Sequence, residues 1–169
     1  ESVNAHYMKQ ADNGRLTALA ADRMAALIGR PLSDSERDLL LRSMDELKPR
    51  AKNLNELAGS ALFLVRSRPL VMDEAAAKLL DEPGRALLAA ADAALASVPT
   101  WERDTLEAAA KAVAEAQGLG LGKVAGPLRA ALTGQAVSPS VFAIMATLGR
   151  AESMGRIRDV LDGRAGTAA

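Results

Sequence analysis

The sequence has 169 residues, with 21 basic and 21 acidic side chains, one histidine and no cysteine. The lack of cysteine excludes a disulfide framework, a thiolate nucleophile and a Cys-ligated zinc site, and a single histidine excludes a metal centre of several histidines. The length suits one domain or two small ones, and a formal charge of zero by itself argues against a nucleic-acid partner.

The composition predicts an all-α protein. Ala and Leu account for 61 residues, whereas Val and Ile account for only 12. Ala and Leu favour helices, and β-branched residues favour strands. No apolar run reaches the roughly 18 residues of a membrane-spanning helix, and no signal peptide is visible. We therefore expect a cytoplasmic chain with no membrane contact, or a piece of a longer chain.

Caps and helical spacing predict three helices in the first part of the chain. Gly29 is expected to end the first helix, because glycine suits a helix C-terminus. Ser33 or Asp34 caps the second helix, Pro49 stops it, and Asn53 starts the third. The predicted helices cover about 13–28, 33–48 and 53–65.

Residues 66–69, Arg-Ser-Arg-Pro, interrupt this pattern. We place a domain boundary there, which gives two consecutive helical bundles over 1–68 and 69–169. Further helices are expected over about 73–80, 83–98, 101–117, 124–132, 138–148 and 150–161. Thr100 is expected to cap the helix that begins at Trp101. Residues from Gly163 onward are expected to fray.

Ser138 and Pro139 suit the N-cap and the first position of a helix. A helix N-terminus with free N–H groups is also a good place to bind an anion or a base acceptor.

One glycine-rich stretch resembles a phosphate-binding loop but does not fit its pattern. In 118–123, the final Lys123 is followed by Val124, where the motif needs Ser or Thr, and no strand precedes it. We interpret this stretch as a flexible connection between helices. Because the carboxylates fall mostly at caps and on solvated faces, we predict no catalytic residue and no metal site.

The zero net charge conceals an uneven distribution. Residues 42–68 and 121–169 each carry a net charge of +3, whereas 1–41 carry −1 and 69–120 carry −5. Charge runs usually form solvated faces. Both basic segments, however, contain connections between helices, where arginines can point outward together.

Three motifs near the end of the chain resemble the C-terminal half of bacterial glutamyl-tRNA synthetases. They are Gly126-Pro-Leu-Arg-Ala-Ala-Leu-Thr-Gly134, Val137-Ser-Pro-Ser-Val-Phe142 and Leu148-Gly-Arg150. The family pattern is Pro-Leu-Arg-x-Ala-Leu-Thr-Gly, then Ser/Thr-Pro-x-Leu-Phe, then Leu-Gly-Lys/Arg. Here Val141 replaces the usual Leu. Further landmarks follow the family order: Asn4-x-His-Tyr7, Lys48-Pro49-Arg50 and Trp101.

This resemblance implies a helical stem-contact region and first anticodon-binding subdomain over 1–68, and a second anticodon-binding subdomain over 69–169. The catalytic signatures HIGH and KMSKS of the family do not occur in this sequence. The resemblance thus implies a part that cannot aminoacylate alone and holds no cofactor. ATP and magnesium would belong to the N-terminal catalytic domain. The implied partners are that domain and tRNA(Glu), through its anticodon loop and stem.

The resemblance also assigns residues. Arg50 matches the family arginine that reads the third anticodon base and separates glutamate from glutamine tRNAs, and Arg129 matches an arginine at the first base. A guanidinium fork can donate two hydrogen bonds to a base edge. Ser138 and Pro139 match a pair that contacts the first two bases of the splayed loop. Additional expected contacts are Lys48, Lys123 and Phe142, although the helical position of Phe142 favours core packing.

A second hypothesis remains open: a helical protein-interaction module without RNA binding, whose basic segments are simply solvated. The positions of Arg50, Arg129 and Ser138 discriminate between the two. Separate faces favour the interaction module, and one exposed groove favours tRNA.

Overall fold

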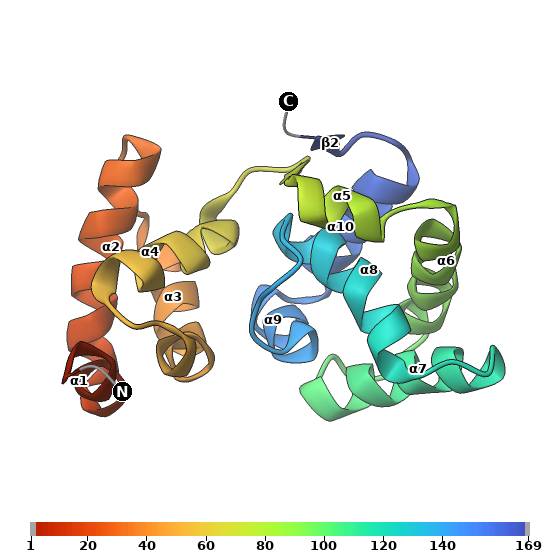
Figure 1. Ribbon diagram of the computed structural model, residues 1–169, viewed down its shortest axis with the longest axis horizontal. Helices are drawn as coiled ribbons and strands as arrows, with labels where there is room; N and C mark the ends of the chain where they lie inside the picture. The colour runs from red at the N-terminus through yellow and green to blue at the C-terminus, as the bar shows by residue number, and fades with distance from the viewer. Residues whose placement is uncertain (1–2, 168–169) are drawn as a thin grey trace. The chain divides into compact units, whose positions relative to one another are not determined.

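A computed structural model describes residues 3–167, and the side chains of Val3 and Asn4 lie outside the description. The Asn4 landmark is therefore not described. The chain divides into two compact units, Glu1–Arg66 (unit 1) and Ser67–Ala169 (unit 2). Figure 1 shows that both are built almost entirely from helices, so the all-α prediction is confirmed.

Unit 1 packs its longer helices around a small apolar core. Its described elements are α1 (Val3–Gln10), α2 (Asn13–Ile28), α3 (Asp34–Leu47), the 3-10 helix η1 (Lys48–Arg50), α4 (Leu54–Ala61) and the 3-10 helix η2 (Leu62–Val65). Helix α2 contacts α3 and α4, and Leu16, Met24, Leu40 and Leu57 are fully buried. The sequence analysis did not predict α1, which buries Ala5 and Met8.

Side-chain caps set the helix starts of unit 1, as predicted. Ser33 and Glu36 form a reciprocal capping box, in which the Glu36 N–H donates to the Ser33 hydroxyl and the Ser33 N–H donates to the Glu36 carboxylate. Asn53 caps α4 by accepting from the Glu56 N–H. Gly29 ends α2 with a left-handed backbone, at φ +77°.

Unit 2 surrounds a central helix. Its described elements are β1 (Val71–Met72), α5 (Glu74–Leu79), α6 (Glu82–Ala96), α7 (Arg103–Ala116), α8 (Leu121–Thr133), α9 (Val141–Leu148), α10 (Arg150–Leu161) and β2 (Gly166–Thr167). Helix α8 contacts each of the other five helices. The core therefore lies along α8, where Val124, Leu128 and Leu132 are fully buried.

Three predicted helix starts in unit 2 are wrong, those of α7, α8 and α9. Helix α7 begins at Arg103 rather than Trp101, and Thr100 does not cap it, because the Thr100 hydroxyl lies 3.2 Å from the Thr105 hydroxyl. The Trp101 indole instead packs inward and donates to the Met145 carbonyl over 2.8 Å. Helix α8 begins at Leu121, so it takes in residues that the sequence analysis placed in a connection.

The chain end is ordered up to Thr167, which corrects the expectation of fraying. Strand β2 pairs in parallel with β1, with Val71 opposite Gly166 and Met72 opposite Thr167. The Gly166 N–H donates to the Leu70 carbonyl over 3.1 Å. These backbone bonds compensate for the few apolar side chains at this end.

Buried and half-buried charges reinforce the same corner of unit 2. The Arg68 guanidinium donates two hydrogen bonds to Asp159, from Nε over 2.8 Å and from Nη2 over 3.1 Å. Arg164 also approaches Asp159, at 3.0 Å. The hydrogen bond from Arg68 is the main cause that lowers the pKa of Asp159. Gly155 makes room for Arg68, because a Cβ there would lie 2.1 Å from the guanidinium.

Arg156 is an unusual core residue. Its side chain is 1% exposed, and it donates to Glu152 over 2.9 Å and to the Leu132 carbonyl over 2.8 Å. Burial lowers the pKa of its guanidinium, and Glu152 opposes this effect. The bond to Leu132 ties α10 to the last turn of α8.

In residues 3–167, no helix combines the length and apolarity that a membrane crossing requires.

Candidate nucleic-acid interface

Arg129 and Ser138 meet at the C-terminal end of α8. The Arg129 Nε donates to the Ser138 hydroxyl over 2.9 Å. That hydroxyl donates in turn to the Pro139 carbonyl over 2.8 Å. Ser138 is only 9% exposed, whereas Arg129 is half-buried. The contact fixes the orientation of the Arg129 guanidinium.

A tight turn brings these two residues together. Gly134 ends α8 at φ +73°, a conformation that suits glycine, and its N–H donates to the Ala130 carbonyl. A Cβ on Gly134 would lie 2.6 Å from the Val71 carbonyl oxygen, so β1 also requires glycine here. The Thr133 hydroxyl accepts from the Gln135 N–H and fixes the first step of the loop. The predicted helix end at Thr133-Gly134 is confirmed.

The loop after this turn differs from the sequence expectation. Ser140, rather than Ser138, caps α9, because its hydroxyl accepts from the Ala143 N–H. Ser138 and Pro139 are both buried before the helix starts. Phe142 is 5% exposed and belongs to the core, so its ring is not available to stack on a base. Val137, by contrast, is 77% exposed beside Ser138.

Arg50 and Lys48, the two residues of unit 1 that are expected to contact tRNA, differ from each other in exposure. Arg50 is exposed at the end of η1, and within residues 3–167 its guanidinium has no hydrogen bond or ion pair. Lys48 is largely buried, with a side chain 17% exposed. It donates to the Asn13 side chain over 2.7 Å and thereby joins η1 to the start of α2. Lys48 thus contributes to the packing of unit 1, and its expected RNA contact stays a prediction.

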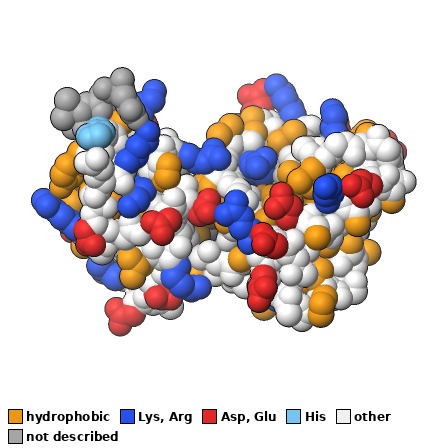
Figure 2. Space-filling model, turned by 90° about the horizontal axis from the view of Figure 1, so that it is seen from below, with side chains coloured by type: hydrophobic (Ala, Val, Ile, Leu, Met, Phe, Trp, Pro, Cys, Tyr) orange, Lys and Arg blue, Asp and Glu red, His pale blue; other side chains and the backbone are white. Residues whose placement is uncertain are grey.

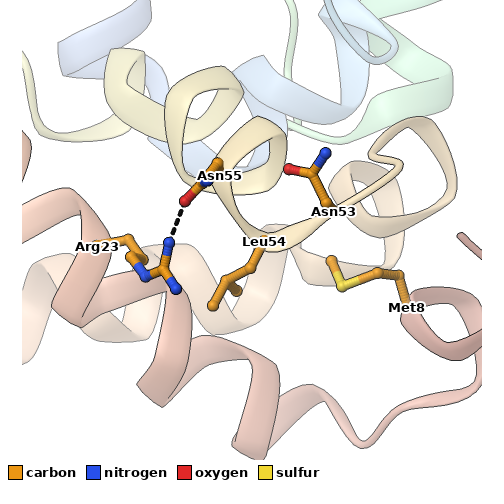
Figure 3. A pocket seen from close by; sticks show the side chains of 5 residues that line it. All are labelled: Met8, Arg23, Asn53, Leu54 and Asn55. Atoms are coloured by element: carbon orange, nitrogen blue, oxygen red, sulfur yellow. Dashed lines mark hydrogen bonds between the residues drawn. The ribbon is translucent and has the colours of Figure 1, made fainter. Parts of the chain in front are cut away.

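A small pocket lies next to the segment that carries Arg50. It has a volume of about 280 Å³ and is lined by Met8, Arg23, Asn53, Leu54 and Asn55. Figure 3 shows Arg23 and Asn55 pointing toward each other, and the guanidinium donates to the amide oxygen. Asn53 is also engaged, as the cap of α4. The polar side chains of this pocket already form hydrogen bonds within unit 1. Arg50 is therefore a better candidate than the pocket for a contact with a ligand.

Basic and acidic side chains alternate on one visible face of unit 2 (Figure 2). On the face of unit 2 that Figure 2 shows, Lys and Arg side chains are interspersed with Asp and Glu. In the described residues, no cluster of three or more His, Cys, Asp or Glu side chains could hold a metal ion.

The structure brings together Arg129, Ser138 and Pro139, whereas Arg50 belongs to the other unit. Sequence reasoning missed the direct contact between Arg129 and Ser138. Nine residues and a turn separate them, and no periodicity predicts such a contact.

These features define an all-helical domain that presents arginines at the ends of helices. Comparison with known sequences then gives the family. The profile described as "Anticodon binding domain" matches residues 15–161. The chain therefore belongs to the anticodon binding domain family.

Curated relatives and solved structures agree. The chain is 56% identical to glutamate–tRNA ligase 2 of Rhizorhabdus wittichii over 161 residues, which cover 95% of this chain and 34% of the relative. It is 48% identical to glutamate–tRNA ligase 2 of Zymomonas mobilis with the same coverage. A glutamate–tRNA ligase structure from Elizabethkingia meningosepticum matches with a TM-score of 0.75 and 26% identity, over 94% of this chain and 31% of that one. The chain thus spans about a third of the curated relatives it matches.

Proposed function

We propose that this chain is the anticodon-recognition part of a glutamate–tRNA ligase and binds the anticodon loop and stem of tRNA(Glu). The membership in the anticodon binding domain family and the names of the relatives support this proposal. The observation that carries it in the structure is the oriented guanidinium of Arg129 on Ser138. The whole enzyme would attach glutamate to tRNA in the cytoplasm, with ATP and magnesium in an N-terminal catalytic domain.

The roles of individual residues form part of the proposal. Arg129 reads the first anticodon base, and the backbone of Ser138 contacts the first two bases beside Pro139. The Ser138 hydroxyl is already used between Arg129 and Pro139, so it acts as a positioning group. Arg50 reads the third base with a guanidinium that is unengaged in the described structure. Assigning the two subdomains to the stem and the anticodon belongs to the same proposal. No specific observation favours the interaction-module hypothesis.

Salt-dependent binding tests the proposed function. Titration of the full chain with a tRNA(Glu) transcript, followed by fluorescence anisotropy, is expected to show an association constant that falls linearly with salt on logarithmic axes. The slope should be about −0.7 to −0.9 for each phosphate contacted. An anisotropy that does not change when the transcript is added, or an association constant that does not depend on salt, would contradict the proposal. An equally long RNA without a folded anticodon arm is the control.

A further inference from the structure

A second pocket lies in unit 2, between α8 and the junction of α5 with α6. It has a volume of about 600 Å³, within the range of ligand sites. Its walls are mainly apolar or glycine, with three charged side chains. The lining residues used below are Lys78, Leu79, Asp81, Leu87, Gly122 and Lys123. We call this pocket the α8 groove.

The charges of the groove favour an anionic occupant. Lys123 is exposed in the first turn of α8, and Lys78 is exposed on α5 with a loose ion pair to Glu74 at 3.4 Å. The one carboxylate of the lining, Asp81, caps α6 by accepting from the Gly84 N–H over 2.8 Å. Its negative charge is therefore partly offset by the positive end of the α6 dipole. The two ammonium groups remain at the rim.

The groove ends about one helical turn from the proposed anticodon contact, because Gly126 lines it and Arg129 follows three residues later on α8. Gly122, Gly126 and Arg129 are spaced by four and three residues, so they lie along one face of α8. Gly122 and Arg129 are seven residues apart, or about 10 Å along the helix axis. Neighbouring nucleotides of one strand can span this distance. A strand that contacts Arg129 can thus follow α8 into the groove.

The groove also accounts for a glycine that the fold itself does not require. Gly122 is helical and exposed, and a Cβ there would meet no atom within 4 Å. Gly122 is the second residue of α8, and glycine has a lower helix propensity than alanine. Because glycine has no Cβ, a ligand can approach the helix backbone closely at this position.

We propose that the α8 groove receives one nucleotide of the tRNA anticodon arm, next to the bases read by Arg129. Its base packs against Leu79 and Leu87, and its phosphate lies between Lys78 and Lys123. This inference rests on the proposed function and extends it to a contact outside the anticodon bases.

Two variants test the groove without weakening the fold. In Lys123→Glu the new carboxylate lies in the first turn of α8, where negative charge stabilises a helix, and Gly122→Leu adds a better helix former. Both proteins are expected to melt at or above the wild-type temperature. Lys123→Glu should nevertheless weaken binding of a tRNA(Glu) transcript about tenfold and reduce the salt slope by about 0.7. Gly122→Leu should weaken binding several-fold with an unchanged slope.

Lys111→Glu is the matched control, because Lys111 is exposed on α7 of the same unit and does not line the groove. Equal effects of Lys123→Glu and Lys111→Glu would overturn the groove proposal, as would unchanged affinity in Gly122→Leu. Arg129→Ala separates this failure from failure of the proposed function. If Arg129→Ala weakens binding while the groove variants do not, only the groove proposal is wrong. If the wild-type chain does not bind the transcript, both proposals are wrong.

Discussion

Arg50 of unit 1 and three arginines of unit 2 have different surroundings. In unit 2 they stabilise the interior or are oriented by neighbours: Arg156 is buried, Arg68 pairs with Asp159, and Arg129 donates to Ser138. In unit 1, Arg50 projects from a short 3-10 helix and is unengaged within the described residues. The comparison teaches that exposure and orientation, rather than net charge, distinguish an arginine that can read a base from one that maintains the fold.

The largest effect is expected from the arginine network of unit 2. Asp159→Ala removes the buried carboxylate that accepts two hydrogen bonds from Arg68, which should lower the free energy of unfolding by about 3 kcal/mol. Denaturant titration followed by the fluorescence of Trp101 measures this unit, because Trp101 is the only tryptophan of the chain. Asp162→Asn is the control, since the Asp162 pair with Arg164 is exposed on both sides and should contribute below about 1 kcal/mol. Equal losses would refute the structural role of Asp159.

The glycine that ends α8 should be less tolerant than the one that ends α2. Both have a left-handed backbone, but a Cβ on Gly134 would lie 2.6 Å from the Val71 oxygen, whereas one on Gly29 would have no atom within 4 Å. Gly29→Ala should cost about 1 kcal/mol from the backbone alone, and Gly134→Ala about 2 kcal/mol or more. Thermal unfolding followed by circular dichroism compares them. If Gly134→Ala loses less stability than Gly29→Ala, β1 can shift away from the added Cβ without an energetic cost, which would contradict this prediction.

A smaller, pH-dependent effect is expected in unit 1. The hydrogen bond from Arg30, followed by the capping bonds of Ser33, lowers the pKa of Glu36 from 4.5 to about 2. Because the folded state has the lower pKa, this contribution is present above about pH 4.5 and is lost as the pH falls toward 2. Glu36→Gln should thus cost about 1 kcal/mol at neutral pH and nothing near the folded pKa. A difference between variant and wild type that stays constant across this pH range would contradict the interpretation.

The predictable parts of the fold are those set by local chemistry. Ser33, Asn53 and Asp73 each cap a helix through an N–H three residues ahead, so the pattern is visible in the sequence. The pairing of Arg68 with Asp159 joins residues 91 positions apart. The pairing of β1 with β2 joins residues that are even farther apart in the chain. Tertiary packing alone determines these contacts, and no periodicity indicates them.

The candidate site was predictable to a similar degree. Motif resemblance identified Arg129 and Ser138, but it did not indicate that the serine hydroxyl orients the arginine. The resemblance places Lys48 among the expected tRNA contacts. In the structure, its ammonium group donates a hydrogen bond to the Asn13 side chain within unit 1. Ser140 rather than Ser138 caps α9, because residues 137–140 are not helical and the helix begins at Val141.

Anticodon discrimination is the most direct test of the central claim that exposed Arg50 reads a base. The affinity of the full chain is measured for tRNA(Glu) and for the same transcript with the third anticodon base replaced. The wild-type chain should prefer the natural base by about 1–3 kcal/mol, and Arg50→Gln should largely abolish this preference. Arg66→Gln, a change of another exposed arginine of unit 1, should preserve it. An undiminished preference in Arg50→Gln, or none in the wild-type chain, would contradict the account.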